Sequence, residues 1–188
     1  MTAATPLTTG LPVRHGFFTR EGGVSEGPYA SLNCSLSGQD RRAAVLENRA
    51  RAAAALGADP AHLVGLTQVH GAAVVQVTEP WAAGAGPAAD AMVTDRPGLA
   101  LGVVTADCAP VLLADPTAGV VGAAHAGWRG ALAGVLEATV DAMLRLGARG
   151  ERIAAAIGPC IGAASYEVGS DLRAAVLARD PADARFFR

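Results

Sequence analysis

The chain has 188 residues, the length of one ordinary domain. A hydrophobic fraction of 51% and a charged fraction of 17% predict a folded core and exclude a disordered chain. The net charge of −2 offers no basic surface for a nucleic-acid backbone, and no apolar run reaches the roughly 18 residues of a membrane span. We therefore expect a single domain over residues 1–188 that is cytoplasmic and has no nucleic-acid, membrane or obligate protein partner.

Apolar runs separated by turn residues predict both strands and helices. The predicted strands cover residues 15–20, 64–69, 72–77, 99–105, 111–114, 120–124 and 153–157. The predicted helices cover residues 41–56, 130–146 and 170–179. Asp40 and Asp59 are suited to cap helical starts, and Gly57 is suited to end the first long helix. Because strands occur in both hairpin and crossover settings, we expect a mixed α+β fold rather than a doubly wound parallel sheet.

The most informative pair in the sequence is Cys108 and His125. The run from Asp115 to Gly119 has hairpin-turn chemistry and joins two predicted strands. If the turn is centred between Pro116 and Thr117, Cys108 lies directly opposite His125, with Cβ atoms about 4.5–5.5 Å apart on one face. That separation suits a thiolate sulfur and an imidazole nitrogen that share one zinc ion.

Two ligands do not hold a catalytic metal, and His70 is the only other strong candidate. A set of two histidines and one cysteine would leave one coordination position open for water, as catalytic zinc sites do. The alternative is that Cys108 is a small core residue and that each histidine simply has its hydrogen bonds satisfied. The sequence contains no CxxC, HExxH or HxH motif that would decide between the two.

Four ordered runs of the chain strongly resemble one known family. They are Thr67-Gln68-Val69-His70-Gly71, Thr105-Ala106-Asp107-Cys108, His125-Ala126-Gly127-Trp128-Arg129-Gly130 and Ile157-Gly158-Pro159-Cys160-Ile161-Gly162. The loop from Thr19 to Asn33 and the run Glu47-Asn48-Arg49 fit the same pattern. The family was first labelled polyphenol oxidase or laccase-domain proteins. Its members are now described as purine nucleoside phosphorylases and adenosine deaminases, and in bacteria also as peptidoglycan editing factors.

The resemblance carries expectations about fold, metal and extent. It implies an α+β fold with a largely antiparallel, β-sandwich-like core flanked by helices, similar to a bacterial toxin deamidase domain with a Cys/His site. It implies that His70, Cys108 and His125 bind zinc, with copper as the other possible metal. Family members usually continue to a Phe-Phe-Ser-x-Arg-Arg-like segment. This chain ends within a stretch that matches the middle of the family, so we expect that C-terminal segment to be absent from it.

Phosphorolysis needs an anion site, and a planar guanidinium is well suited to phosphate. The family match makes Arg49 the first candidate, for catalysis as well as for phosphate binding, with Arg129 and Arg20 after it. The alternative for Arg49 is a position on a solvated helix face, where Glu47 and Arg51 form an ordinary pair one helical turn apart.

Three further polar residues each have more than one interpretation. Asn33 is either a turn residue or a group that binds ribose or base. Asp107, next to Cys108, is a strand-end cap, a catalytic acid or base, or an orienting partner of a metal-bound histidine. Asp90 is a weaker candidate of the same kind as Asp107.

These features support competing hypotheses about function. The first is a zinc enzyme that phosphorolyses adenosine, inosine and methylthioadenosine to free base and ribose 1-phosphate and also deaminates adenosine. The second is a hydrolase or amidase editing peptidoglycan precursors, with Cys108 as nucleophile and His125 as base. A copper polyphenol oxidase is disfavoured because four histidines cannot fill a multinuclear copper site. A non-enzymatic binding module is disfavoured by the polar loops at strand ends.

Overall fold

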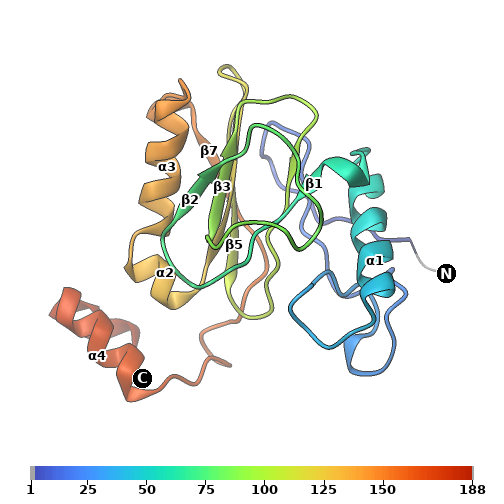
Figure 1. Cartoon of the computed structure of the whole chain (residues 1–188). Coiled ribbons are helices and arrows are strands. Elements are labelled where there is room, and N and C mark those ends of the chain that lie inside the picture. The colour runs from blue at the N-terminus through green and yellow to red at the C-terminus, as the bar shows by residue number, and fades with distance from the viewer. Residues whose placement is uncertain (1–2, 188) are drawn as a thin grey trace.

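The centre of the computed structural model, which describes residues 3–187, is a five-stranded mixed sheet (Figure 1). In sheet order its strands are β2 (Val74–Gln76), β3 (Ala91–Thr94), β6 (Val120–Ala126), β5 (Ala109–Asp115) and β7 (Ala154–Ile157). Only β2 and β3 are parallel; the other neighbours are antiparallel. A separate parallel pair joins β1 (Leu63–Val64) to β4 (Ala100–Leu101). The predicted mixed, largely antiparallel α+β fold is confirmed, whereas its likeness to a toxin deamidase stays a prediction.

Helices lie on both sides of this sheet. They are α1 (Arg42–Ala55), α2 (Trp128–Leu132), α3 (Val135–Arg145) and α4 (Ser170–Arg179), with short 3-10 turns at Gly27–Tyr29, Pro60–His62, Gly150–Arg152 and Pro181–Phe186. Figure 1 shows α3 along one face of the sheet, α1 on the opposite side, and α4 set apart beyond α2. Within residues 3–187, no helix has the length and apolar character required to cross a membrane.

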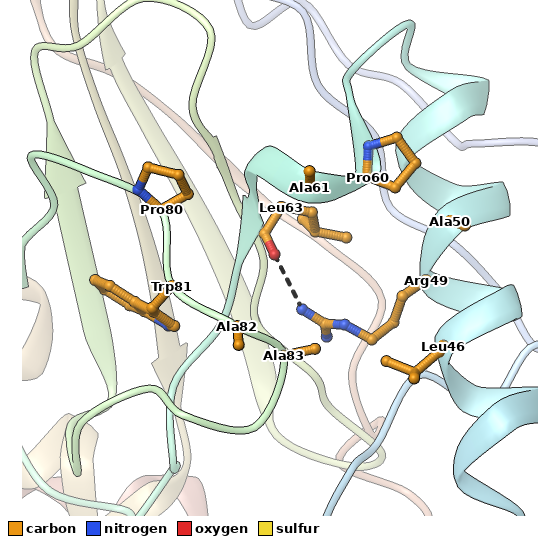
Figure 2. Close-up of a pocket in the computed structure, with 10 residues that line it drawn as sticks. All are labelled: Leu46, Arg49, Ala50, Pro60, Ala61, Leu63, Pro80, Trp81, Ala82 and Ala83. Atoms are coloured by element: carbon orange, nitrogen blue, oxygen red, sulfur yellow. Dashed lines mark hydrogen bonds between the residues drawn. The ribbon is translucent and has the colours of Figure 1, made fainter.

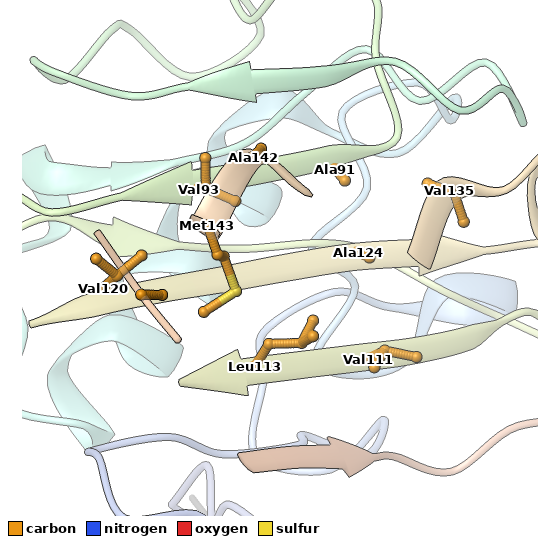
Figure 3. Packing of buried hydrophobic residues seen from close by; sticks show 10 residues of the cluster. Ala91, Val93, Val111, Leu113, Val120, Ala124, Val135, Ala142 and Met143 are labelled. Carbon is orange, nitrogen blue, oxygen red and sulfur yellow. The ribbon is translucent and has the colours of Figure 1, made fainter. Parts of the chain in front are cut away.

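The main core lies between the sheet and α3 (Figure 3). Strand side chains that alternate toward α3, such as Val111 and Leu113, pack with Met143 of that helix. The helix comes close because β6 has a glycine at its centre. A Cβ atom on Gly122 would lie 3.2 Å from both Met143 Sδ and Thr139 Cγ2. The opposite face of the sheet is covered in part by the N-terminal segment, which leaves room for a cavity on that side.

Several predicted strands are shorter or absent in the structure. The strand predicted over residues 15–20 is wrong, since Phe17 forms only an isolated bridge with Leu7. The strands predicted over 64–69 and 99–105 shrink to β1 and β4. Beyond those short strands, the Gln68 side-chain amide donates to the Val104 carbonyl and accepts from the Val104 N–H, at 2.8 Å each. A side-chain amide therefore takes the place of further strand pairing.

The helix predictions are mostly confirmed, with two corrections. The helix predicted over 130–146 is broken into α2 and α3 by Gly134, whose φ of 88° is left-handed. Asp40 does not cap α1, because its carboxylate instead accepts hydrogen bonds from Ser25 and Asn33. Asp59 does cap the turn that follows, by accepting from the backbone N–H of Ala61.

The β5–β6 hairpin differs from the predicted register by two residues. The turn contains four residues, so Asp115 pairs with Val120 and His125 pairs with Pro110 rather than with Cys108. Pro110 is tolerated there because the N–H of His125 points the other way, to the carbonyl of Asp90 just before the neighbouring strand β3. An error of two residues preserves the face of the sheet, since side chains alternate with a period of two. Cys108 and His125 therefore remain on one face, as diagonal neighbours.

Asp115 ties this hairpin turn to the next segment of the chain. Its buried carboxylate accepts from the N–H groups of Thr117, Ala118 and Arg149 and from the Arg152 guanidinium. The Arg152 contact, helped by the backbone donors, outweighs desolvation and lowers the pKa of Asp115 from 3.8 to about 2.

Replacing Asp115 with Asn should lower the free energy of unfolding at neutral pH. Since the folded-state pKa is depressed, the contribution of Asp115 is complete above its unfolded value of 3.8 and is lost as the pH falls toward about 2. Urea unfolding of wild type and Asp115→Asn across this range should show two free energies that converge at low pH. A difference that is independent of pH would contradict the prediction.

Candidate metal centre

Three separate segments bring His70, Cys108 and His125 together. His70 lies in the turn before β2, Cys108 directly precedes β5, and His125 lies near the end of β6. One potential ligand atom from each side chain lies within 4.8 Å of the other two. Cys108 Sγ is 3.9 Å from His70 Nε2, and the two imidazole rings meet edge to face with centroids 4.8 Å apart. His70 is exposed and His125 is only 3% exposed, so the cluster runs from the surface to the core.

A glycine makes room for this cluster. Gly127 directly follows β6 and, by extension of the hairpin register, faces Cys108. A Cβ atom at Gly127 would lie 2.7 Å from His70 Cδ2 and 3.1 Å from Cys108 Sγ. Any larger residue would therefore push the two side chains apart or fill the space between them. Gly127 is part of the family-like run His125–Gly130 in the sequence. Only the folded structure shows why a glycine is required there.

The histidine in the core is held by a buried carboxylate. His125 Nδ1 lies 2.8 Å from Asp90 Oδ1, and both side chains are almost fully buried. Burial alone would raise the pKa of Asp90, but His125 and the backbone N–H groups of residues 69–71 outweigh it and lower that pKa. Asp90 rather than Asp107 is thus the carboxylate in contact with a candidate ligand.

The donor set fits one transition-metal ion. Two imidazole nitrogens and a thiolate sulfur are the ligands that zinc and copper prefer in proteins. Burial raises the pKa of the Cys108 thiol, and the negative charges of Asp107 and Asp90 add to this effect. A bound cation would oppose all three influences, because metal ligation deprotonates a thiol. Metal binding by these three residues remains a prediction from their geometry.

A large cavity approaches the centre from the side of α1. Its volume is about 1230 Å³, and its lining includes Arg49 together with Thr105, Ala106 and Pro110, which flank Cys108 in the chain. Arg20 and Asn33 also line it. None of the three candidate metal ligands is part of this lining, so the cavity reaches the neighbourhood of the centre rather than the ligand atoms themselves.

Arg49 is a buried cation with few polar partners to offset the loss of its hydration. The residue is 8% exposed, and its guanidinium makes a long contact of 3.5 Å to the Leu63 carbonyl (Figure 2). Within residues 3–187, no carboxylate forms an ion pair with it. Burial lowers the pKa of Arg49, which the nearby Cys34 partly opposes, but a guanidinium remains charged at neutral pH. Arg49 also borders a smaller pocket of about 500 Å³ beside Trp81. The solvated-face interpretation is therefore wrong for Arg49.

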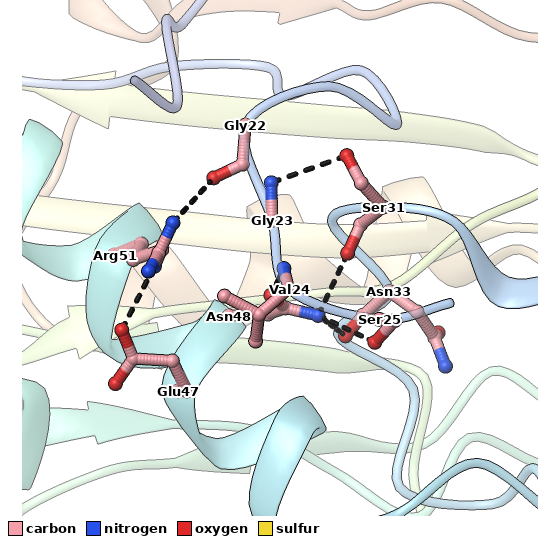
Figure 4. Close-up of polar contacts among 9 residues, drawn as sticks. All are labelled: Gly22, Gly23, Val24, Ser25, Ser31, Asn33, Glu47, Asn48 and Arg51. Atoms are coloured by element: carbon pink, nitrogen blue, oxygen red, sulfur yellow. Dashed lines mark hydrogen bonds and ion pairs between the residues drawn. The ribbon is translucent and has the colours of Figure 1, made fainter. Parts of the chain in front are cut away.

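Asn48 fixes the loop from Thr19 to Asn33 (Figure 4). Residues of this loop line the large cavity. Its side chain accepts from the N–H of Val24 and donates to Ser25 Oγ and to the carbonyls of Ser31 and Asn33. With all these bonds made, Asn48 is completely buried. The run Glu47-Asn48-Arg49 thus has a residue that holds the loop next to a residue that lines the cavity.

The remaining predicted site residues are less central. The Asn33 side chain is engaged with Asp40 and with the N–H of Ser35, as expected of a turn residue. Arg129 is 61% exposed, stacks on Trp128 and lies 3.7 Å from an Asp171 oxygen. Neither interaction brings Arg129 into the large cavity.

Arg20 and Asp107 complete the set. Arg20 lines the cavity while its guanidinium donates to the Ala30 carbonyl. The Asp107 side chain is exposed, and within residues 3–187 its carboxylate has no hydrogen-bond partner.

Fold and cluster together define an α+β protein with a candidate mononuclear centre of two histidines and one cysteine. The chain belongs to the family whose model is described as multi-copper polyphenol oxidoreductase laccase, which matches residues 14–188. The predicted family resemblance is confirmed.

Named relatives and solved structures agree with this assignment. A protein of Streptomyces griseus named purine nucleoside phosphorylase ORF3 is 55% identical over 88% of this chain and 68% of its own length. A purine nucleoside phosphorylase of Deinococcus radiodurans is 52% identical over 87% of this chain and 63% of its own. The crystal structure of Neisseria meningitidis protein NMB0706 is similar with a TM-score of 0.84 and 37% identity, over 98% of this chain and 74% of that one.

A second solved structure covers less of both chains. YlmD from Geobacillus stearothermophilus has a TM-score of 0.81 at 37% identity, over 87% of this chain and 63% of its own. The chain described here spans about two thirds of the length of these relatives.

Proposed function

We propose that this chain carries the metal and phosphate sites of a purine nucleoside phosphorylase that also deaminates adenosine. The observation that supports this most directly is the cluster of His70, Cys108 and His125, whose donor atoms lie within 4.8 Å of one another. The cavity beside it holds a buried guanidinium, and relatives named purine nucleoside phosphorylase are 52–55% identical. The proposed partners are small molecules only, a purine nucleoside and phosphate.

Zinc is the metal we propose for this centre. A mixed set of two imidazoles and one thiolate, with a position left open, is typical of catalytic zinc sites. Copper is the alternative metal. A multinuclear copper centre requires more ligands than the single cluster of three found within residues 3–187. When bound, zinc supplies Lewis-acid chemistry that activates water near neutral pH, which deamination at C6 of adenine requires.

For phosphorolysis, the proposed role of Arg49 is to bind and orient phosphate. A phosphate oxygen forms the new bond to ribose C1′ while the C1′–N9 bond breaks. The purine leaves with the bonding electron pair and takes up a proton, which gives free base and ribose 1-phosphate. Because the base leaves with little covalent assistance, the rate depends on positioning phosphate and stabilising charge.

Other residues have secondary proposed roles. Asp107 is the proposed acid–base group, since its free carboxylate is adjacent in sequence to Cys108. Asn33 is proposed to contact the sugar or base from the cavity wall, and Arg129 is second to Arg49 as an anion-binding residue. A cavity of about 1230 Å³ has room for adenosine, inosine or methylthioadenosine together with phosphate.

The proposal is tested by metal analysis combined with an assay of base release. Protein purified without chelator should contain one zinc per chain, with an anomalous signal at the three ligands. The same preparation should release adenine from adenosine only when phosphate is present, and should form ribose 1-phosphate in equal amount. Base release without phosphate, or zinc-free protein with full activity, would overturn it.

Arg49→Lys should weaken phosphate binding selectively. Lysine keeps the charge but loses the planar fork, so we expect the KM for phosphate to rise about tenfold, with a smaller change for nucleoside. Steady-state kinetics with each substrate varied in turn measures both effects. The matched control is Arg51→Lys on the same helix, where Arg51 pairs with Glu47 at 2.8 Å. An unchanged phosphate KM would remove Arg49 from the phosphate site.

One observation favours a second function. In space, Asp90, His125 and Cys108 are arranged in the order of a carboxylate, base and nucleophile. His125 Nδ1 lies 2.8 Å from Asp90 Oδ1, and a potential ligand atom of His125 lies within 4.8 Å of Cys108 Sγ. This order is that of a Cys/His hydrolase or amidase, for which peptidoglycan precursors are the proposed substrates.

Thiol alkylation separates the two functions. A zinc-bound Cys108 thiolate should be protected from iodoacetamide until the metal is stripped, whereas a free nucleophilic thiolate should react at once. Mass spectrometry of peptides containing Cys108 and Cys160 provides the measurement, with exposed Cys160 as the internal control. Rapid labelling of Cys108 in fully metallated protein would favour the hydrolase.

A further inference from the structure

We infer that Asp90 is a positioning residue that holds two of the proposed metal ligands, His70 and His125, with a single carboxylate. This inference rests on the metal centre of the proposed function and assigns a role to a residue outside the ligand set. Asp90 directly precedes β3, is completely buried, and faces the turn that contains His70.

Both carboxylate oxygens of Asp90 accept from the turn that contains His70, and one of them also contacts the His125 ring. Oδ1 accepts from the N–H of His70 at 2.9 Å and lies 2.8 Å from His125 Nδ1. Oδ2 accepts from the N–H of Gly71 at 2.7 Å and of Val69 at 3.2 Å. A single atom, Oδ1, therefore links the backbone of one ligand residue to the imidazole of another.

The turn that Asp90 binds has an unfavourable backbone conformation. His70 has a φ of 61°, the only left-handed value of a residue other than glycine within residues 3–187. A side chain in this region is sterically unfavourable, so the conformation must be held by its surroundings. The three successive N–H groups that converge on Asp90 provide that restraint. Without them the His70 side chain would lose its defined direction.

The contact with His125 determines which ring nitrogen is free. A carboxylate only accepts hydrogen bonds, so His125 must carry its proton on Nδ1. The Nε2 lone pair is then available to a metal, as in metal sites where a carboxylate supports a histidine ligand. The backbone carbonyl of Asp90 also accepts a hydrogen bond from the backbone N–H of His125, at 2.7 Å. His125 is thus held by both its backbone and its ring.

The charge of Asp90 is otherwise unmatched. Within residues 3–187, its only ionisable hydrogen-bond partner is His125, and no arginine contacts it. Asp115, the other completely buried aspartate, is paired with Arg152 at 2.9 Å. A cation bound on the far side of His125 would supply the positive charge that Asp90 lacks.

The test compares zinc affinity in Asp90→Asn and Asp115→Asn. An Asn amide cannot accept from four N–H groups, so Asp90→Asn should weaken zinc binding by about 10- to 100-fold in competition with a chromogenic chelator. Asp115→Asn removes an equally buried carboxylate from the far end of β5, about 23 Å along the chain from Cys108. It should lower stability and leave zinc affinity within a factor of two of wild type.

The outcomes distinguish this inference from the metal proposal. If wild type binds no zinc, the metal centre itself is overturned. If wild type binds zinc and Asp90→Asn binds it equally well, only the role of Asp90 is overturned. Should Asp90→Asn fail to fold, nitrogen-15 NMR of the wild-type histidines decides. Metal-free protein should show His125 with a proton on Nδ1, and a ring protonated on Nε2 alone would overturn the inference.

Discussion

The antiparallel pairing of β6 between β3 and β5 is the constraint on which the candidate centre depends. His125 lies near the end of β6, Asp90 just before β3 and Cys108 just before β5, so the three meet at the same end of the sheet. The turn with His70 is attached to that end through Asp90. Gly122 and Gly127 lie on this same segment, one allowing α3 to approach and the other leaving room for the cluster. One central strand therefore organises both the core and the site.

The three candidate ligands could be found from the sequence even though the predicted register was wrong. The hairpin turn has four residues, because Asp115 accepts from Thr117 and Ala118 within it, and pattern reasoning placed its centre one residue early. That error shifted every pair by two and so left Cys108 and His125 on one face. A shift by one would have put them on opposite faces. The long apolar strands and α4 were also predictable, since periodicity and turn residues determine them locally.

What sequence patterns could not provide is the set of side chains that bond to distant backbone. Gln68 ends one strand by binding Val104, and Asn48 secures a loop that lies about twenty residues before it. Asp40 looked like a helix cap because its local chemistry is right, yet it serves that same loop. Such polar groups are ambiguous locally, since each has several possible partners and only the folded chain selects one. The same ambiguity made Asp107 seem a better orienting residue than Asp90.

Two buried charges without full partners distinguish this structure from an ordinary packed domain. Within residues 3–187, the only ionisable partner of Asp90 is a histidine and Arg49 has no carboxylate partner, whereas Asp115 has Arg152. Burying an unpaired charge is unfavourable, so a fold that retains one must be compensated by a ligand or by function. The two charges have opposite signs, and their natural complements are a cation at the histidines and an anion in the cavity. The proposed metal-dependent reaction of phosphate would satisfy both requirements, while a hydrolase that uses only Cys108 and His125 would leave Arg49 without a role.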